Sequence, residues 1–161
     1  MPNWCENRLA ISGDVADVKT FIKKGLDENG NWNLDNYYPM PKELHDDGWY
    51  EWRIANWGTK WDVGVDGVNE DDDVIYFLSA WSPPCEWLSK VATENPHLSF
   101  RLTYVEGGIF FAGISEFVKG RHTLSDECEP MYVNEDGDEL NASEIDWDND
   151  YAILACPYDY E

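Results

Sequence analysis

Val74-Ile75-Tyr76-Phe77-Leu78-Ser79-Ala80-Trp81 is a nearly continuous apolar run, and Ser82-Pro83-Pro84 follows it directly. A run of this length predicts a central strand that is buried on both faces. The next three residues predict the start of a helix, with Ser82 as the N-cap and a proline at the first helical position. This junction decides the fold, because the neighbouring elements can be placed outward from it in both directions.

After the junction, apolar side chains at helical spacing predict a helix that ends at Asn95-Pro96. Residues 98–105 alternate, and residues 109–118 return as a hairpin partner across Glu106-Gly107-Gly108. Further on, residues 131–133 and Leu140 flank Asn134-Glu135-Asp136-Gly137 and predict a small hairpin.

Before the junction, residues 4–12 predict a first strand, and Asp14 is a good N-cap for a first helix that reaches about Gly25. We expect a short helix over residues 48–57, a strand over 60–65 and a turn over 66–73.

The resulting order is β-α-β-β-α-β followed by an extra strand, which predicts an α+β fold with a ferredoxin-like core: two helices on one face of an antiparallel sheet. We expect a single domain over residues 1–161. Its core spans 1–119 and includes a Trp-rich insertion over 27–58, and residues 120–161 form an acidic extension with the small hairpin. The chain is long enough to bury a core without a metal or a disulfide.

The charge is strongly acidic and unevenly distributed. Thirty-three acids and eleven bases give a net charge of −22, and residues 122–161 hold thirteen acids with no Lys or Arg. Such a field repels nucleic acid and anionic membranes, because phosphate binding depends on basic side chains. It favours a basic partner.

The sequence lacks the patterns that are typical of a secreted or membrane protein. The four cysteines are far apart and form no CxxC pair, so free thiols are expected. We find no signal-peptide pattern at the N-terminus, and no apolar run approaches the roughly 20 residues that span a bilayer. A reducing cytoplasm is the expected compartment.

Three motifs carry a family resemblance: Met1-Pro2-Asn3-Trp4-Cys5, Asn56-Trp57-Gly58-Thr59-Lys60-Trp61-Asp62 and Ala80-Trp81-Ser82-Pro83-Pro84. On these, the chain resembles the YubB-type family with a ferredoxin-like domain, from Met1 to about Lys119. The resemblance implies that fold and a setting on phages and plasmids, which places the protein in the host cytoplasm. It implies no catalytic residues.

Six of the nine tryptophans lie between Trp49 and Trp87. Two interpretations fit them. In one, the indoles pack the insertion against the core. In the other, they line a small-ligand or enzymatic pocket whose candidate residues are Asn56, Trp57, Lys60, Trp61, Asp62 and Trp81.

Other site chemistry finds little support. Acidic stretches near Asn134 and Asp146 lack the glycine and the glutamate of a calcium loop, and the three histidines have no zinc-ligand spacing. No nucleophile motif is present, and Pro2 as a catalytic amine is a minor alternative to its place at the start of the first strand. We predict no metal, no cofactor and no catalytic residue.

The leading hypothesis is therefore a non-enzymatic binding protein of a mobile element that engages a basic host protein, with nucleic-acid mimicry against a host defence protein as its narrower form. The alternatives are the tryptophan pocket and a structural or oligomerising module. The candidate acidic surface consists of Glu70, Asp71, Asp72, Asp73, Glu135, Asp136, Asp138, Glu139, Glu144, Asp146, Asp148 and Asp150.

Overall fold

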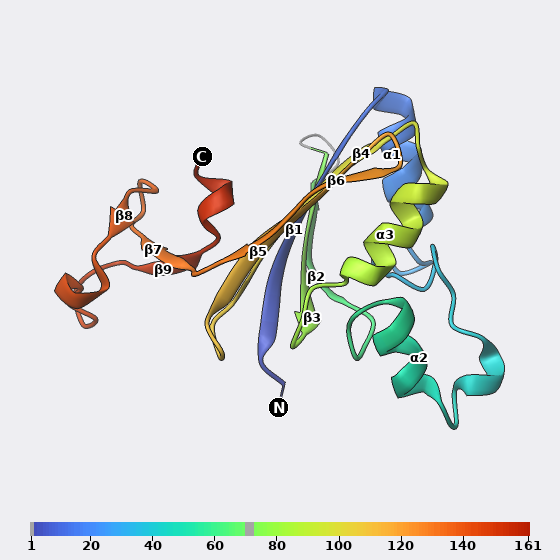
Figure 1. Cartoon of the computed structure of the whole chain (residues 1–161), viewed down its shortest axis with the longest axis horizontal. Coiled ribbons are helices and arrows are strands. Elements are labelled where there is room, and N and C mark those ends of the chain that lie inside the picture. The colour runs from blue at the N-terminus through green and yellow to red at the C-terminus, as the bar shows by residue number, and fades with distance from the viewer. Residues whose placement is uncertain (1, 70–72) are drawn as a thin grey trace.

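The computed structural model describes residues 2–69 and 73–161, and Figure 1 shows their arrangement as a twisted sheet with helices on one face and a small lobe beyond its end. The helices are α1 (Val15–Lys24), α2 (Trp49–Asn56) and α3 (Cys85–Glu94), with short 3-10 turns η1 (Lys42–Leu44), η2 (Ala142–Glu144) and η3 (Pro157–Asp159). The strands are β1 (Trp4–Ser12), β2 (Gly64–Asn69), β3 (Val74–Ala80), β4 (Ser99–Glu106), β5 (Phe111–Val118), β6 (Arg121–Cys128), β7 (Met131–Val133), β8 (Glu139–Leu140) and β9 (Ile153–Ala155).

The main sheet has the order β2-β3-β1-β4-β5-β6. Its first four strands, with α1 and α3, give the predicted ferredoxin-like α+β arrangement. β1 pairs antiparallel with both β3 and β4, so that Asn7 lies opposite Phe77 on one side and Tyr104 on the other. The strand predicted from the 74–81 run is therefore internal, although β1 is the strand at the centre of this core.

The core lies between the sheet and the helices and is rich in aromatic rings. Alternate residues of β1 turn towards it, and α1 contributes Val18, Phe21 and Ile22. Trp32, Trp57 and Trp87 are each 1% exposed. Trp32 packs edge-on against Trp87 at a ring separation of 5.6 Å, which ties the segment between α1 and β2 to helix α3.

Three expectations were wrong in detail. β2 begins at Gly64 rather than near Lys60 and continues to Asn69, through part of the expected turn. The reason is Asp62, whose carboxylate accepts the N–H groups of Leu34, Asp35 and Val63 and holds this stretch out of the sheet. Helix α3 has Pro84, not Ser82, at its N-cap.

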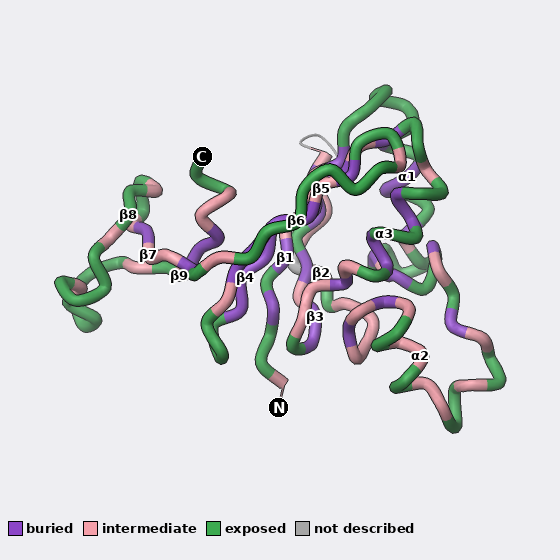
Figure 2. The backbone as a smooth tube through the Cα atoms, viewed as in Figure 1, coloured by how far each residue is buried: buried purple, intermediate pink, exposed green. Residues whose placement is uncertain are grey.

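β6 and β9 were not predicted, because neither has a clear apolar alternation. β6 is an edge strand that is exposed along almost its whole length, as Figure 2 shows. The predicted small hairpin is confirmed as β7 and β8, and β9 adds a third strand on the other side of β7. We call residues 129–155, which contain this three-stranded sheet, the C-terminal lobe.

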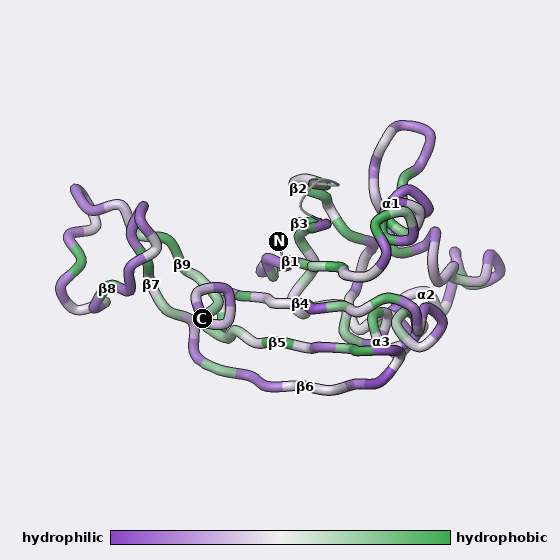
Figure 3. Tube along the Cα trace, turned by 90° about the horizontal axis from the view of Figure 1, so that it is seen from above, coloured by the Kyte–Doolittle hydropathy of each residue, from purple (hydrophilic) through white to green (hydrophobic). Residues whose placement is uncertain are grey.

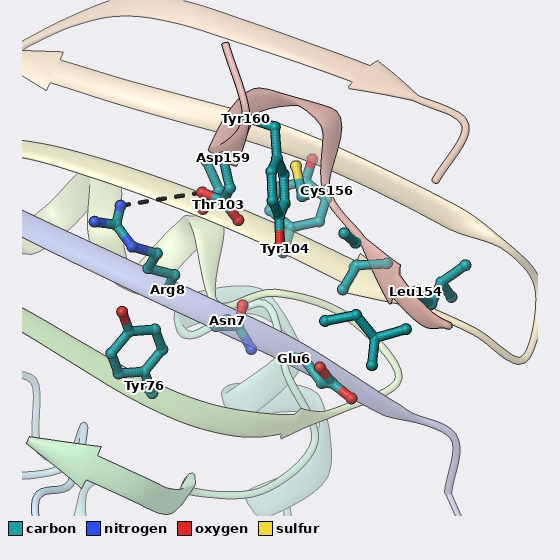
Figure 4. A pocket seen from close by; sticks show the side chains of 13 residues that line it. Glu6, Asn7, Arg8, Tyr76, Thr103, Tyr104, Leu154, Cys156, Asp159 and Tyr160 are labelled. Carbon is teal, nitrogen blue, oxygen red and sulfur yellow. Dashed lines mark hydrogen bonds and ion pairs between the residues drawn. The ribbon is translucent and has the colours of Figure 1, made fainter. Parts of the chain in front are cut away.

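The end of the chain returns from this lobe to the face of the main sheet opposite the helices (Figure 4). Cys156 is buried against Val105 and Ala112. The Thr103 hydroxyl donates a hydrogen bond to Asp159 at 2.6 Å, and Arg101 donates one to the backbone carbonyl of Tyr158 at 2.7 Å. These contacts fix the lobe to the sheet through η3.

Candidate functional site

The six residues predicted to line a pocket divide into two groups. Asn56, Trp57 and Asp62 hold the inserted segment in place. The Trp57 indole N–H donates to the Tyr38 carbonyl at 2.9 Å, and the Asn56 amide oxygen accepts the Tyr38 hydroxyl at 2.6 Å. Burial raises the pKa of the Asp62 carboxyl, against the lowering effect of the three backbone N–H groups that it accepts. These three side chains therefore stabilise the fold.

Lys60, Trp61 and Trp81 come together at the surface, at the end of the sheet where β1 begins. The Lys60 Nζ lies 4.6 Å from the ring centroids of both Trp61 and Trp81. Trp4 joins the cluster, with its ring 6.4 Å from that of Trp61. The predicted site residues are thus split between a buried anchor and a half-exposed aromatic cluster that holds a cation.

The predicted acidic surface is open over the part of it that the structure describes. All thirteen Asp and Glu residues between 122 and 161 are exposed. Among the described residues, one ion pair involves this set: Asp159 with Arg8, at 4.0 Å. Asp73 is partly exposed, whereas Glu70, Asp71 and Asp72 lie outside the described residues. The negative charge of the C-terminal lobe is therefore mainly exposed to solvent.

Some of these carboxylates also shape the backbone. Asp146 accepts hydrogen bonds from the Asn149 side-chain amide and from the Asp148 backbone N–H, and these bonds lower the pKa of its carboxyl below the ordinary value. Asn134 accepts the N–H groups of Asp136 and Asp138 in the turn between β7 and β8. No three His, Cys, Asp or Glu side chains in residues 2–69 and 73–161 are grouped so that they could hold a metal ion.

A row of exposed and partly exposed aromatic rings crosses this acidic region, and sequence reasoning missed it. Phe110 lies 6.3 Å from Tyr132, and Tyr132 lies 5.2 Å from Trp147, measured between ring centroids. Phe110 is 42% exposed and Trp147 is 61% exposed. A row of accessible rings of this kind is typical of an interaction surface rather than of a core.

Phe110 and Tyr132 also line a groove of about 510 Å³ between the β4–β5 turn and the lobe. Phe110, Met131, Tyr132 and Leu140 supply its apolar lining, and Glu129 and Glu139 supply carboxylates. We call these residues, together with Trp147 packed against Tyr132, the acidic aromatic groove. Figure 3 shows the lobe as a projection from the main sheet in which hydrophilic stretches alternate with short apolar ones.

The turn between β4 and β5 sets the position of Phe110. The buried carboxylate of Glu106 accepts the N–H groups of Gly108 and Ile109 at 2.6 and 2.8 Å. A side chain at Gly108 would meet the side-chain ends of Asn3 and Glu106, which would have to move to make room for it. Phe110 itself has φ of 64°, a conformation that is costly for a bulky residue. The signal in the sequence was Ile109-Phe110 directly after Gly-Gly, which the hairpin interpretation had assigned to a strand.

A second hollow, of about 190 Å³, lies where the end of the chain meets the sheet (Figure 4). Arg8, Tyr76 and Thr103 line it from the sheet, and Asp159 and Tyr160 from the chain end. It is smaller than most ligand pockets. Two of its polar groups, Arg8 and Thr103, bind Asp159, so this hollow serves mainly to attach the chain end.

The fold and the open acidic surface define the class: an α+β protein with a ferredoxin-like core. Residues 56–151 match the family described as the ferredoxin-like domain in Api92-like protein, and the chain belongs to that family. The matched range starts after β1 and α1 and runs through most of the C-terminal lobe, so it includes the groove. The comparison with curated proteins and the comparison with solved structures each found no significant match.

Proposed function

We propose that this protein is a non-enzymatic binding protein that engages a basic protein partner through its C-terminal lobe. The acidic aromatic groove is the observation that supports this most strongly. Carboxylates alone are a common means of solubility, whereas exposed aromatic rings set among them supply the anchors that carry binding energy in protein interfaces. The groove combines both.

The acids and the aromatic rings have different roles in this proposal. Thirteen exposed acids steer a basic partner and speed its association, an effect that weakens as salt shortens the Debye length to about 10 Å at 0.1 M. The rings of Phe110, Tyr132 and Trp147 then pack against the aliphatic stems or the guanidinium groups of its Lys and Arg side chains. Glu129 and Glu139 pair with the charged ends.

The setting belongs to the same proposal. In this proposal the protein is a YubB-type protein encoded by a phage or plasmid, and it acts in the cytoplasm of the host on a basic host protein. Among the described residues, no helix is long and apolar enough to cross a membrane. The narrower form is mimicry, in which the carboxylates occupy a groove that normally receives phosphates. It requires that the protein displace a labelled DNA duplex from its partner.

A salt titration with a defined probe tests the proposal. The probe is a short synthetic peptide of Arg, Lys and Leu, and its binding is followed by the intrinsic tryptophan fluorescence of the protein and by calorimetry. We expect binding at low ionic strength that falls steeply as salt rises. An acidic peptide with the same leucines serves as the negative control.

Matched variants separate the groove from the overall charge. Glu129→Gln with Glu139→Gln removes two charges from the groove, and Glu28→Gln with Glu51→Gln removes two exposed charges from the helical side. The groove pair should weaken peptide binding about tenfold, and the distant pair about twofold or less. Equal losses in both double variants, or no binding at low salt, would refute a groove-centred site.

A further inference from the structure

The Trp61–Trp81 pair has an unusual occupant. Lys60 places its ammonium 4.6 Å from both ring centroids, so the cation is held between two indoles. In a chain with three acids for every base, Lys60 forms no ion pair with any residue in the described part of the structure. The site therefore holds a cation by aromatic faces and not by a carboxylate.

Both walls of this site are fixed by backbone contacts. Trp81 has φ of 68°, and its N–H donates to the Asn3 carbonyl at 2.9 Å. The Ser79 hydroxyl donates to the Ser82 carbonyl at 2.7 Å, and the Ser82 hydroxyl donates to the Gly58 carbonyl at 2.6 Å. These bonds hold Trp81 in a conformation that a tryptophan rarely adopts.

The Trp61 wall is held by contacts of its neighbours Thr59 and Asp62, in the segment before β2. Thr59, which is fully buried, donates its hydroxyl to the Ala80 carbonyl at 3.1 Å, and the Asp62 carboxylate is fixed by backbone N–H groups. The occupant has no comparable fixed contact, since a lysine side chain has four rotatable bonds and Lys60 forms no ion pair within residues 2–69 and 73–161. Trp4 and Trp81 are 44% and 42% exposed, so solvent reaches the site.

We propose that Trp61 and Trp81 form a binding site for an alkylated ammonium group, with Lys60 as an internal occupant that an external cation displaces. A methylated ammonium is larger and more weakly hydrated than that of lysine, so it gains more from two indole faces and loses less hydration. The group is supplied either by a free small cation or by a methylated lysine of a peptide. This site is separate from the acidic aromatic groove and does not depend on it.

Titration with tetramethylammonium chloride tests the site, with sodium chloride at equal ionic strength as the reference. Binding is followed by the NMR signals of the Trp61 and Trp81 indole N–H groups. Lys60→Ala removes the occupant, so we expect it to bind tetramethylammonium about tenfold more tightly than the unmodified protein does. Equal affinity in the two proteins, or equal binding of the neutral analogue 3,3-dimethylbutanol, would overturn the proposal.

Trp81→Gly is the matched variant for the wall. Glycine accepts the positive φ at this position, so the turn keeps its shape while one indole is lost. Tetramethylammonium binding should be abolished in Trp81→Gly, both alone and combined with Lys60→Ala. The circular dichroism spectrum should be unchanged. Retained binding in Trp81→Gly would overturn the proposal. Binding of the Arg/Lys/Leu peptide to the groove should not change in either variant, which keeps this test distinct from that of the proposed function.

A peptide arm identifies the source of the cation. A peptide with one trimethyllysine that binds Lys60→Ala more tightly than tetramethylammonium does assigns the site to a methylated protein. Equal affinities assign it to a free small cation. If the unmodified lysine peptide binds as well as the trimethyllysine peptide, selection for the alkylated group is refuted.

Discussion

The helical layer and the C-terminal lobe use tryptophan in opposite ways. In the helical layer, Trp32, Trp57 and Trp87 are each 1% exposed, and each indole N–H donates to an oxygen within the protein. In the C-terminal lobe, Trp147 is 61% exposed and lies edge-on against Tyr132. The environment, and not the residue type, therefore decides whether an aromatic ring stabilises the fold or remains available to a partner.

Replacement of a tryptophan in each region gives the largest expected difference. Trp57→Ala leaves a cavity and removes a buried hydrogen bond to Tyr38, so it should lower the free energy of unfolding by about 3–5 kcal/mol. Trp147→Ala should lower it by no more than about 0.5–1 kcal/mol. Urea denaturation followed by circular dichroism measures both. Comparable losses in the two variants would remove the distinction between the regions.

Asp62 offers an intermediate effect within the helical layer. Asp62→Ala leaves three backbone N–H groups without an acceptor and should cost about 2–3 kcal/mol. Asp62→Asn keeps the oxygen that serves Leu34 and Val63 and should cost about half as much. The same denaturation experiment compares them, with the exposed Asp136→Ala in the lobe as a control near zero. If Asp62→Ala left the free energy of unfolding unchanged, the insertion would be held by its aromatic rings alone.

The smallest expected effect lies in the β4–β5 turn beside the lobe and has the opposite sign. Phe110→Gly relieves the positive φ of 64° and should raise the free energy of unfolding by about 0.5–1 kcal/mol. The same change removes one ring of the groove and should weaken binding of the basic peptide. Thermal denaturation and calorimetry measure the two effects. A clear loss of stability would mean that Phe110 is needed for packing between the β4–β5 turn and the lobe.

The sequence predicted the ferredoxin-like core because its elements carry strong periodic signals. The 74–81 run, the apolar face around Trp87 and Leu88 and the alternation after Leu98 each indicate one structure. β6 and β9 gave no such signal, since an exposed edge strand needs no apolar alternation. The offset of β2 depends on Asp62, whose partners Leu34 and Asp35 are almost thirty residues away in the chain.

The candidate site could be predicted only in part. Composition was enough to find the carboxylates after residue 121, because a stretch that lacks Lys and Arg has nothing to neutralise them internally. The pairing of Lys60 with Trp61 and Trp81 was within the predicted set, but Asn56, Trp57 and Asp62 serve the fold. The groove was missed, because Phe110, Tyr132 and Trp147 are far apart in the sequence and meet only in the folded protein.

The central claim is that the lobe holds its aromatic rings for binding and not for folding. The most direct test measures Trp147→Ala for both properties in one preparation: the affinity for the Arg/Lys/Leu peptide at low salt and the free energy of unfolding. We predict that affinity falls about tenfold while the unfolding free energy stays within about 0.5–1 kcal/mol of the unmodified protein. Unchanged affinity in a fully folded Trp147→Ala protein would contradict the account.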